Sequence, residues 1–245
     1  MIHVNKIRRL SKGFTLIELT LSLTFVSVLL LAISMTIIQA GNIYSRGMVM
    51  KDINQSARSL MAEIKSDVAS AGILSLDEGD YTVTKVSKRV VSGRLCLGNN
   101  SYLWNTADAI KGADSTLKLE ASPDSMINII KVPDPEKKYC AKTHTGALLV
   151  KNTVAALDVN RVSKLLFDGD HKLSITSFVI NTSDTSYDSS TGQRLFSIDF
   201  AIGTGAASAM TDSRDSCRPS GEANSDPIYC NVQPFNLVVR TGGGV

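Results

Sequence analysis

The hydrophobic pattern divides the chain into a long apolar start and a remainder that alternates between apolar and polar residues. Residues 14–38 are apolar with interspersed Thr and Ser, and no charged residue lies between Glu18 and Arg46. A helix over this run is about 37 Å long, at roughly 1.5 Å per residue, and that length crosses the hydrocarbon core of a bilayer with some tilt. The pattern therefore predicts one membrane-spanning helix.

The predicted helix continues beyond the membrane, because apolar residues keep recurring at steps of three and four. The residues of this stripe are Ile43, Gly47, Met50, Ile53, Ala57, Leu60, Met61, Ile64, Val68 and Ala71. The charged residues expected off the stripe are Lys51, Asp52, Arg58, Glu63 and Asp67. Gly72 offers a stop of the C-cap kind. We expect one helix over residues 14–71, whose amphipathic half carries a soluble domain.

After Gly72 apolar residues recur at every second position, and this alternation predicts strands. The clearest strand patterns cover residues 81–86, 173–176, 196–202 and 235–239, and shorter ones cover residues 94–97, 102–104, 126–131 and 147–150. Residues 159–167 are ambiguous and also fit a short helix. Polar residues 181–193 and 204–226 are predicted as long surface loops, and the tail at residues 241–245 as mobile. The expected fold class is α+β, with an antiparallel sheet packed on the helix stripe.

Composition fits one anchored globular domain rather than disorder, since 43% of the 245 residues are hydrophobic and 20% are charged. The formal net charge is +3, but residues 1–13 carry four of the 26 basic residues and none of the 23 acidic ones. Without that leader the net charge is −1, so the basic balance gives no argument for nucleic-acid binding. By the positive-inside rule the leader stays in the cytoplasm and the chain after Arg46 is exported.

The cysteines all follow the apolar run: Cys96, Cys140, Cys217 and Cys230. An even number in an exported domain predicts two disulfides. Three pairings are possible, and we favour Cys96–Cys140 with Cys217–Cys230, because each closes a polar, loop-like stretch. A zinc site is disfavoured, since the chain has no Cys-x-x-Cys pair and only His144 and His171 accompany the cysteines.

The head of the apolar run carries one carboxylate, Glu18, in a place where an unpaired charge is costly. Three readings compete for this stretch. It fits a plain signal anchor, and it fits a capping box, since Thr15 and Glu18 have the spacing that satisfies two helix-start amides. It also fits a secretory signal cleaved after Ala40, although the uncharged run is longer than a usual signal core and Glu18 lies at its front.

Residues 13–18 read Gly-Phe-Thr-Leu-Ile-Glu and follow a basic leader, and this motif resembles the processing site of type IV prepilins. The resemblance implies that prepilin peptidase cleaves between Gly13 and Phe14 and that Phe14 becomes the N-methylated mature terminus. It also implies that Glu18 pairs with the N-terminus of a neighbouring subunit during assembly. A cationic partner at the same depth would neutralise the carboxylate. The helix lacks the proline that many major pilins carry, which is a departure from the family pattern.

Residues 95–105, followed by Tyr139 and Cys140, narrow the resemblance to W-type minor pilins and J-type pseudopilins. The chain would then comprise a cleaved leader (1–13), a transmembrane assembly helix (14–40), an amphipathic helix half (41–72) and an extracytoplasmic β-rich pilin domain (73–245). It would be a single-pass cytoplasmic membrane protein that reaches the cell surface on assembly. Its expected partners are prepilin peptidase, major and minor pilin subunits, the pilus assembly platform and the membrane. Tyr102 and Trp104 are expected to fill the core beside a disulfide.

Signals for other chemistry are weaker. His144 and His171 lie near no nucleophile elbow, and Gly203-Thr204-Gly205 lacks the rest of a phosphate loop, so we expect no enzyme and no cofactor. Two groups of loop acids are candidate calcium ligands, but their spacing matches no EF-hand, so solvated acids are favoured. These groups are Asp77, Glu78 and Asp80, and Asp212, Asp215, Glu222 and Asp226.

A local basic cluster offers a DNA-binding alternative, which strand alternation weakens because it splits the cations between two faces. Its residues are Lys85, Lys88, Arg89 and Arg94. The contrasting class of function is a membrane-anchored or secreted binding domain with an ordinary signal sequence.

Overall fold

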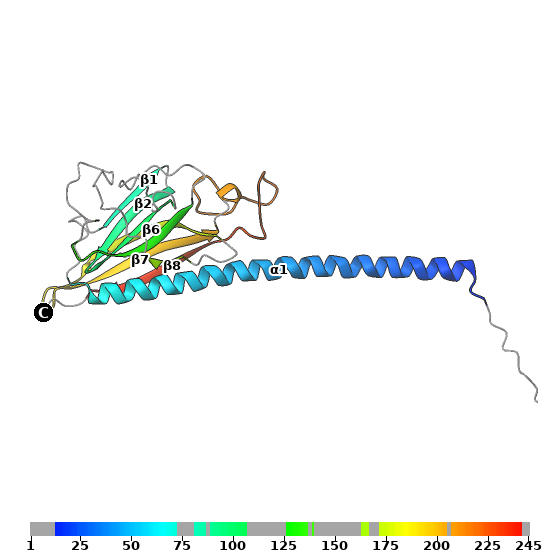
Figure 1. Cartoon of the computed structure of the whole chain (residues 1–245), viewed down its shortest axis with the longest axis horizontal. Coiled ribbons are helices and arrows are strands. Elements are labelled where there is room, and N and C mark those ends of the chain that lie inside the picture. Colours follow the sequence, from blue (N-terminus) through cyan, green and yellow to red (C-terminus); the bar gives the residue numbers. More distant parts are fainter. Residues whose placement is uncertain are drawn as a thin grey trace, which may run out of the picture. The chain divides into compact units, whose positions relative to one another are not determined.

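One long helix and two antiparallel sheets make up the described part of the chain (Figure 1). The computed structural model describes residues 13–72, 81–86, 89–106, 126–136, 139, 163–166, 172–204 and 207–241. The chain forms two compact units, Met1–Tyr44 and Ser45–Val245. The first contains the N-terminal part of the helix, and the second contains the remainder of the helix together with both sheets.

The helix α1 spans Leu16–Ser70, 55 residues, which confirms the prediction of one continuous helix. No proline occurs in it, so its backbone hydrogen-bond ladder is uninterrupted. The amide of Ala71 donates to the carbonyl of Asp67 at 2.7 Å and closes the last turn. The prediction that Gly72 forms a glycine C-cap is wrong. Such a cap needs a positive φ, and the described glycines with a positive φ are Gly98, Gly192 and Gly221.

The larger sheet has the strand order β1-β2-β3-β4-β5 and the smaller one β6-β7-β8. The bounds are β1 Tyr81–Val86, β2 Arg89–Leu97, β3 Asn100–Thr106, β4 Ile127–Pro133, β5 Ser163–Lys164, β6 Leu173–Asp188, β7 Gln193–Thr204 and β8 Val232–Arg240. Every pairing is antiparallel. The α+β expectation is confirmed, and the single sheet predicted from the pattern is corrected to two.

One local prediction was wrong, and one ambiguous stretch is settled in part. The polar residues 181–193, expected to be a loop, belong largely to β6 and the start of β7, where backbone pairing such as Asn181↔Ser197 holds them in a hairpin. Its turn is closed by the Gly192 amide, which donates to the Asp188 carbonyl at 2.8 Å, and Gly192 has a φ of 69°. Within the ambiguous residues 159–167, the described part contains the two-residue strand β5 rather than a helix. The strand predicted at residues 147–150 lies outside the described residues.

The core of the second unit is formed by buried residues of the C-terminal part of α1 and of both sheets. Figure 1 shows the strands lying along this part of the helix. Six predicted stripe residues are buried: Ile53, Ala57, Leu60, Ile64, Val68 and Ala71. Val49, which the stripe missed, is also fully buried, whereas Ile43 is 74% exposed. The prediction that Asp52 and Asp67 lie off the stripe is wrong, since both are buried at 8% exposure.

A row of aromatic rings joins the two sheets across this core. Trp104 on β3 lies 4.5 Å, centroid to centroid, from Phe178 on β6, and the row continues through Phe200 on β7 to Phe235 on β8. Trp104 is 1% exposed and Tyr102 is fully buried. The prediction that these two side chains fill the core is confirmed, and the contact between Trp104 and Phe178 joins the two sheets.

Candidate functional site

The N-terminal end of α1 has the reciprocal hydrogen bonds of a capping box. The Glu18 carboxylate accepts hydrogen bonds from the Thr15 backbone amide at 3.1 Å and from the Thr15 hydroxyl at 2.9 Å. The Glu18 amide in turn donates to the Thr15 hydroxyl oxygen at 3.3 Å. These bonds satisfy helix-start donors and hold the carboxylate at one position near the helix terminus. The capping-box prediction is confirmed.

On the C-terminal side of Glu18, up to Tyr44, the helix is apolar and exposed around its whole circumference. Its most apolar window has a mean hydropathy of 2.4 with no residue buried, so α1 is long and apolar enough to cross a membrane. Large side chains from Phe14, at 81% exposure, to Ile38, at 62%, have no partner surface within the first unit. Apolar area of this extent is unfavourable in water and is expected to be covered by lipid or by other helices.

The hydroxyl groups in the apolar run are satisfied within the helix itself. Thr20, Ser22 and Thr24 each donate to a backbone carbonyl three or four residues earlier, at 2.8–3.1 Å. Ser27 and Ser34 do the same at 2.8 Å. A hydroxyl that already has its acceptor carries little penalty in hydrocarbon, so these residues are compatible with a lipid-facing helix.

Gly13 and Phe14 precede the helix in irregular, exposed backbone. A groove of about 640 Å³ lies along the first turns and is lined by Phe14, Glu18, Leu21, Ser22, Thr24, Phe25 and Val28. The Glu18 carboxylate is the charged group of this groove, and the rest of the lining is almost wholly apolar. The Gly13–Phe14 bond is therefore accessible, while the leader before it lies outside the described residues.

Of the two predicted disulfides, one is confirmed and the other stays a prediction. Cys217 and Cys230 are bonded, with their Cα atoms 5.8 Å apart, which confirms that pair. Cys96 is fully buried and takes part in a disulfide, but Cys140 lies outside the described residues, so the Cys96–Cys140 pairing stays a prediction. The Ser101 hydroxyl donates to the Cys96 sulfur at 3.1 Å.

The loop acids considered for calcium are engaged by the protein itself. Asp212 and Glu222 flank Arg218, at 3.1 and 3.8 Å from its guanidinium nitrogens. Asp215 accepts hydrogen bonds from neighbouring hydroxyls, which hold the pKa of its carboxyl below the usual value. Asp226 accepts from the amides of Ile228 and Tyr229. Among the described residues no three metal-ligating side chains gather, and Asp77, Glu78 and Asp80 lie outside them.

Arg94, one member of the proposed basic cluster, is 2% exposed and donates to the Tyr139 carbonyl at 2.6 Å. It is therefore not available to a nucleic-acid backbone, and its assignment to a DNA-binding patch is wrong. Lys88 and the side chains of Lys85 and Arg89 lie outside the described part. The two candidate histidines, His144 and His171, lie outside it as well.

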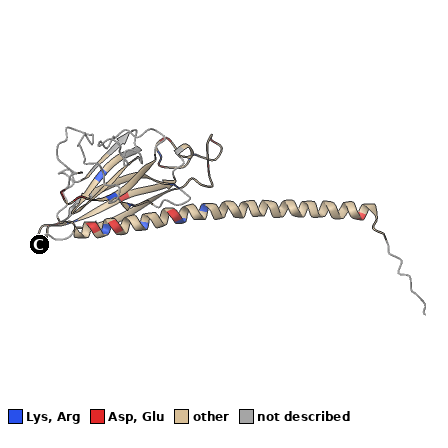
Figure 2. Cartoon of the chain, viewed as in Figure 1, with Lys and Arg blue, Asp and Glu red and all other residues tan. Residues whose placement is uncertain are grey.

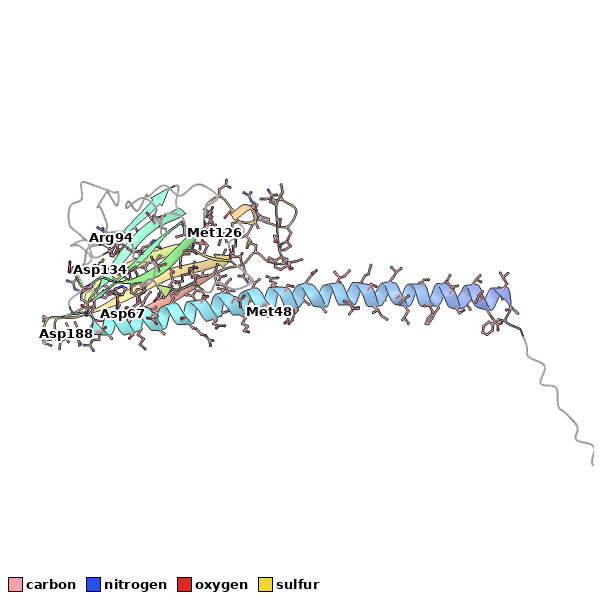
Figure 3. All side chains as sticks on the ribbon, viewed as in Figure 1. Met48, Asp67, Arg94, Met126, Asp134 and Asp188 are labelled. Atoms are coloured by element: carbon pink, nitrogen blue, oxygen red, sulfur yellow. A yellow bond between two sulfur atoms is a disulfide. The ribbon has the colours of Figure 1, made fainter. Side chains whose placement is uncertain are left out.

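Sequence reasoning missed a polar cluster that ties α1 to the larger sheet. Lys131 on β4 lies 2.7 Å from Glu63 and 2.8 Å from Asp67, and the Tyr102 hydroxyl donates to the same Asp67 oxygen at 2.5 Å. Figure 3 labels Asp67 on the part of α1 that lies beside the strands. A signal was present in the chain, since Asp67 lies three residues after Ile64 and directly before Val68, next to the apolar stripe.

Burial lowers the pKa of Lys131, but the hydrogen bonds and negative charges of Asp67 and Glu63 outweigh it, so the net shift is upward. Burial, together with the hydrogen bond to Asp67 and the nearby carboxylate charges, raises the pKa of Tyr102 strongly. The cluster therefore has a structural role in which the lysine stays charged and the tyrosine stays neutral at physiological pH.

Models of known protein families, curated protein sequences and solved structures provide no match to this chain. The functional conclusion therefore rests on the chain's own residues.

Proposed function

We propose that this chain is a minor pilin or pseudopilin, a structural subunit that enters a type IV pilus or a type II secretion-like fibre. In this proposal prepilin peptidase removes residues 1–13 by cleaving between Gly13 and Phe14. The mature subunit waits in the cytoplasmic membrane, meets the assembly platform, and joins other pilin subunits within or at the tip of the fibre. The sheets of the second unit provide contacts with sibling subunits outside the membrane.

The observation that carries the proposal is the placement of Glu18. Its carboxylate is fixed by Thr15 at the head of a helix whose apolar side chains are exposed all round. An anion at the edge of hydrocarbon is costly when alone, and a positively charged N-terminus from an adjacent helix would neutralise it. Because the partner must lie at the same depth, this pairing would also set the axial register between subunits.

The exported location is supported by the second unit. The Cys217–Cys230 disulfide is typical of a domain that matures in an oxidising compartment. The basic leader before an apolar helix favours export of everything that follows the helix. Both features are equally compatible with the second candidate function, an exported binding domain held by an ordinary signal sequence.

The N-terminal sequence of the mature protein separates the candidates. Purified from membranes of its host, the proposed subunit begins at Phe14 and carries one extra methyl group, measured by Edman degradation and intact mass. A chain beginning at Gly41 would identify a cleaved secretory signal, and an uncut chain would identify a simple anchor. Either result overturns the proposal.

The role of the Glu18 charge is tested by two variants that separate it from capping. Glu18→Gln removes the charge but keeps an acceptor for the Thr15 amide, whereas Thr15→Ala weakens the cap and keeps the charge. We expect both to insert into the membrane, Glu18→Gln to fail to enter sheared fibres, and Thr15→Ala to enter them. Fibre incorporation of Glu18→Gln at the wild-type level would show that the assigned role is wrong.

A further inference from the structure

In the second half of α1 the three acids lie on one face of the helix, and three of the four cations lie on another. Its three acids, Asp52, Glu63 and Asp67, lie on the side that packs against the sheets, where two of them are buried. Its four cations, Arg46, Lys51, Arg58 and Lys65, are all exposed, and the last three follow one another at intervals of seven residues. Figure 2 shows that the charged residues of α1 lie in its C-terminal part, apart from one acid near its start.

The three cations form a row that we call the basic stripe: Lys51, Arg58 and Lys65. They are seven residues apart, and seven residues fall only 20° short of two full turns, so the row runs almost parallel to the helix axis. At roughly 1.5 Å per residue, neighbouring cations are about 10 Å apart and the stripe is about 21 Å long. Gln55 and Ala62 lie between them and Ala69 follows Lys65, each four residues after a cation, and all three are exposed.

The stripe cations have no partner within the described part of the chain. Lys131 pairs with Glu63 and Asp67 of α1, and Arg218 and Arg240 pair with acids elsewhere. Lys51, Arg58 and Lys65 make no hydrogen bond or ion pair with any described residue. A row of three exposed, unpaired like charges on one helix repels itself weakly, so it favours a partner of opposite sign.

The chain's own carboxylates do not supply that partner. Every carboxylate whose side chain the structure describes already has an interaction within the chain. They are Glu18, Asp52, Glu63, Asp67, Asp134, Glu136, Asp188, Asp199, Asp212, Asp215, Glu222 and Asp226. A second copy therefore offers no row of free acids among its described side chains.

We propose that the basic stripe docks a different protein, which presents a row of carboxylates at helical spacing. The short side chains of Ala62 and Ala69 let another backbone approach closely, and the three cations set its register along α1. The surface belongs wholly to the second unit, so this inference does not depend on cleavage at Gly13 or on the role of Glu18.

The test uses the full chain in detergent micelles and two synthetic helical peptides of equal composition. One peptide carries a glutamate at every seventh position, and the other carries its glutamates clustered at one end. Fluorescence anisotropy is expected to show about tenfold tighter binding of the spaced peptide, because three exposed ion pairs, each weak alone, form together only when the positions of the charges match. The preference is expected to fade as salt is raised.

Two triple variants with the same change in net charge serve as the matched pair. Lys51→Gln, Arg58→Gln and Lys65→Gln together should remove the preference for the spaced peptide. Arg46→Gln, Lys164→Gln and Lys172→Gln together should leave it unchanged. Equal losses in both triples, or equal binding of the two peptides by the wild-type chain, would overturn the proposal, since either would mean attraction by overall charge.

A photo-crosslinking residue at Ala62, in the native host, tests the identity of the occupant. We expect an adduct with another protein, joined at a segment rich in spaced carboxylates, that disappears in the stripe triple. An adduct between two copies of this chain overturns the proposal. So does a stripe-dependent loss of binding to anionic phospholipid vesicles without any loss of peptide binding, because the occupant would then be a membrane surface.

Discussion

Lys131 on β4 and Asp67 on α1 form an ion pair, with 2.8 Å between Nζ and Oδ2, and their side chains are 20% and 10% exposed. The pair joins residues 64 positions apart and sits beside the fully buried ring of Tyr102, whose hydroxyl donates to the same oxygen. It is therefore a polar tie between the helix and the larger sheet, at a place where the neighbouring contacts are apolar.

Replacing Lys131 by methionine should destabilise the second unit by about 1–2 kcal/mol. The variant keeps most of the apolar stem but leaves Asp67 and Glu63 close together without a cation, and partial exposure keeps the cost below that of a fully buried pair. Urea unfolding of the full chain in detergent measures the change. The exposed Lys172→Met is the control and should shift stability by less than about 0.5 kcal/mol.

Stability should fall as the pH rises above about 10, because the pKa values of Lys131 and Tyr102 are both raised in the folded chain from the ordinary 10.5 and 10.0. A raised folded pKa gives stability that is complete below the unfolded pKa and is lost as the pH approaches the folded one. Unfolding free energies between pH 8 and pH 11 test this sign. In a Tyr102→Phe, Lys131→Met double variant the fall should be shallower, and an equally steep fall would assign it to other groups.

The disulfide between Cys217 and Cys230 should stabilise the loop between β7 and β8. Its sulfurs join positions 13 residues apart, and a loop of that size loses about 3 kcal/mol of closure entropy in the unfolded chain. Replacing both cysteines by serine should lower stability by about 2–3 kcal/mol. Hydrogen exchange should accelerate first around Ala209 and Met210, which form a small buried cluster with Cys230. Unchanged exchange there would mean that the loop holds itself without the bond.

A side chain at Gly203 on β7 is expected to destabilise the second unit. A Cβ there would lie 2.7 Å from the end of the Met210 side chain and 3.1 Å from methyl groups of Thr176 and Val232. Gly203→Ala should therefore cost about 1–3 kcal/mol, since methionine can move but the two branched methyls are fixed by their strands. Gly47→Ala is the opposite case, because the site is open and helical, and it should stabilise α1 by about 0.5–1 kcal/mol. Thermal unfolding of the two variants should shift in opposite directions.

Local pattern was a good guide wherever the structure depends on neighbours in the chain. The steps of three and four predicted α1 to within two residues at its start and one at its end, and the alternation over Tyr81–Val86 predicted β1 with its observed bounds. The capping box was readable from Thr15 and Glu18 because both partners lie within one helical turn. The polar hairpin of β6 was missed because it is held by pairing with β7, which side-chain hydrophobicity does not report.

The sequence by itself determined a helix long and apolar enough to cross a membrane, a carboxylate at its head, and a β-rich domain behind it. Only the tertiary structure decided the division into two sheets, the burial of Arg94 against Tyr139 and the pairing of Asp67 with Lys131. It also decided that Lys51, Arg58 and Lys65 stay exposed and pair with none of the residues that the structure describes. The physical reason is that periodicity is set within a few residues, whereas the pairing of a charge depends on which distant segment the packed core brings beside it.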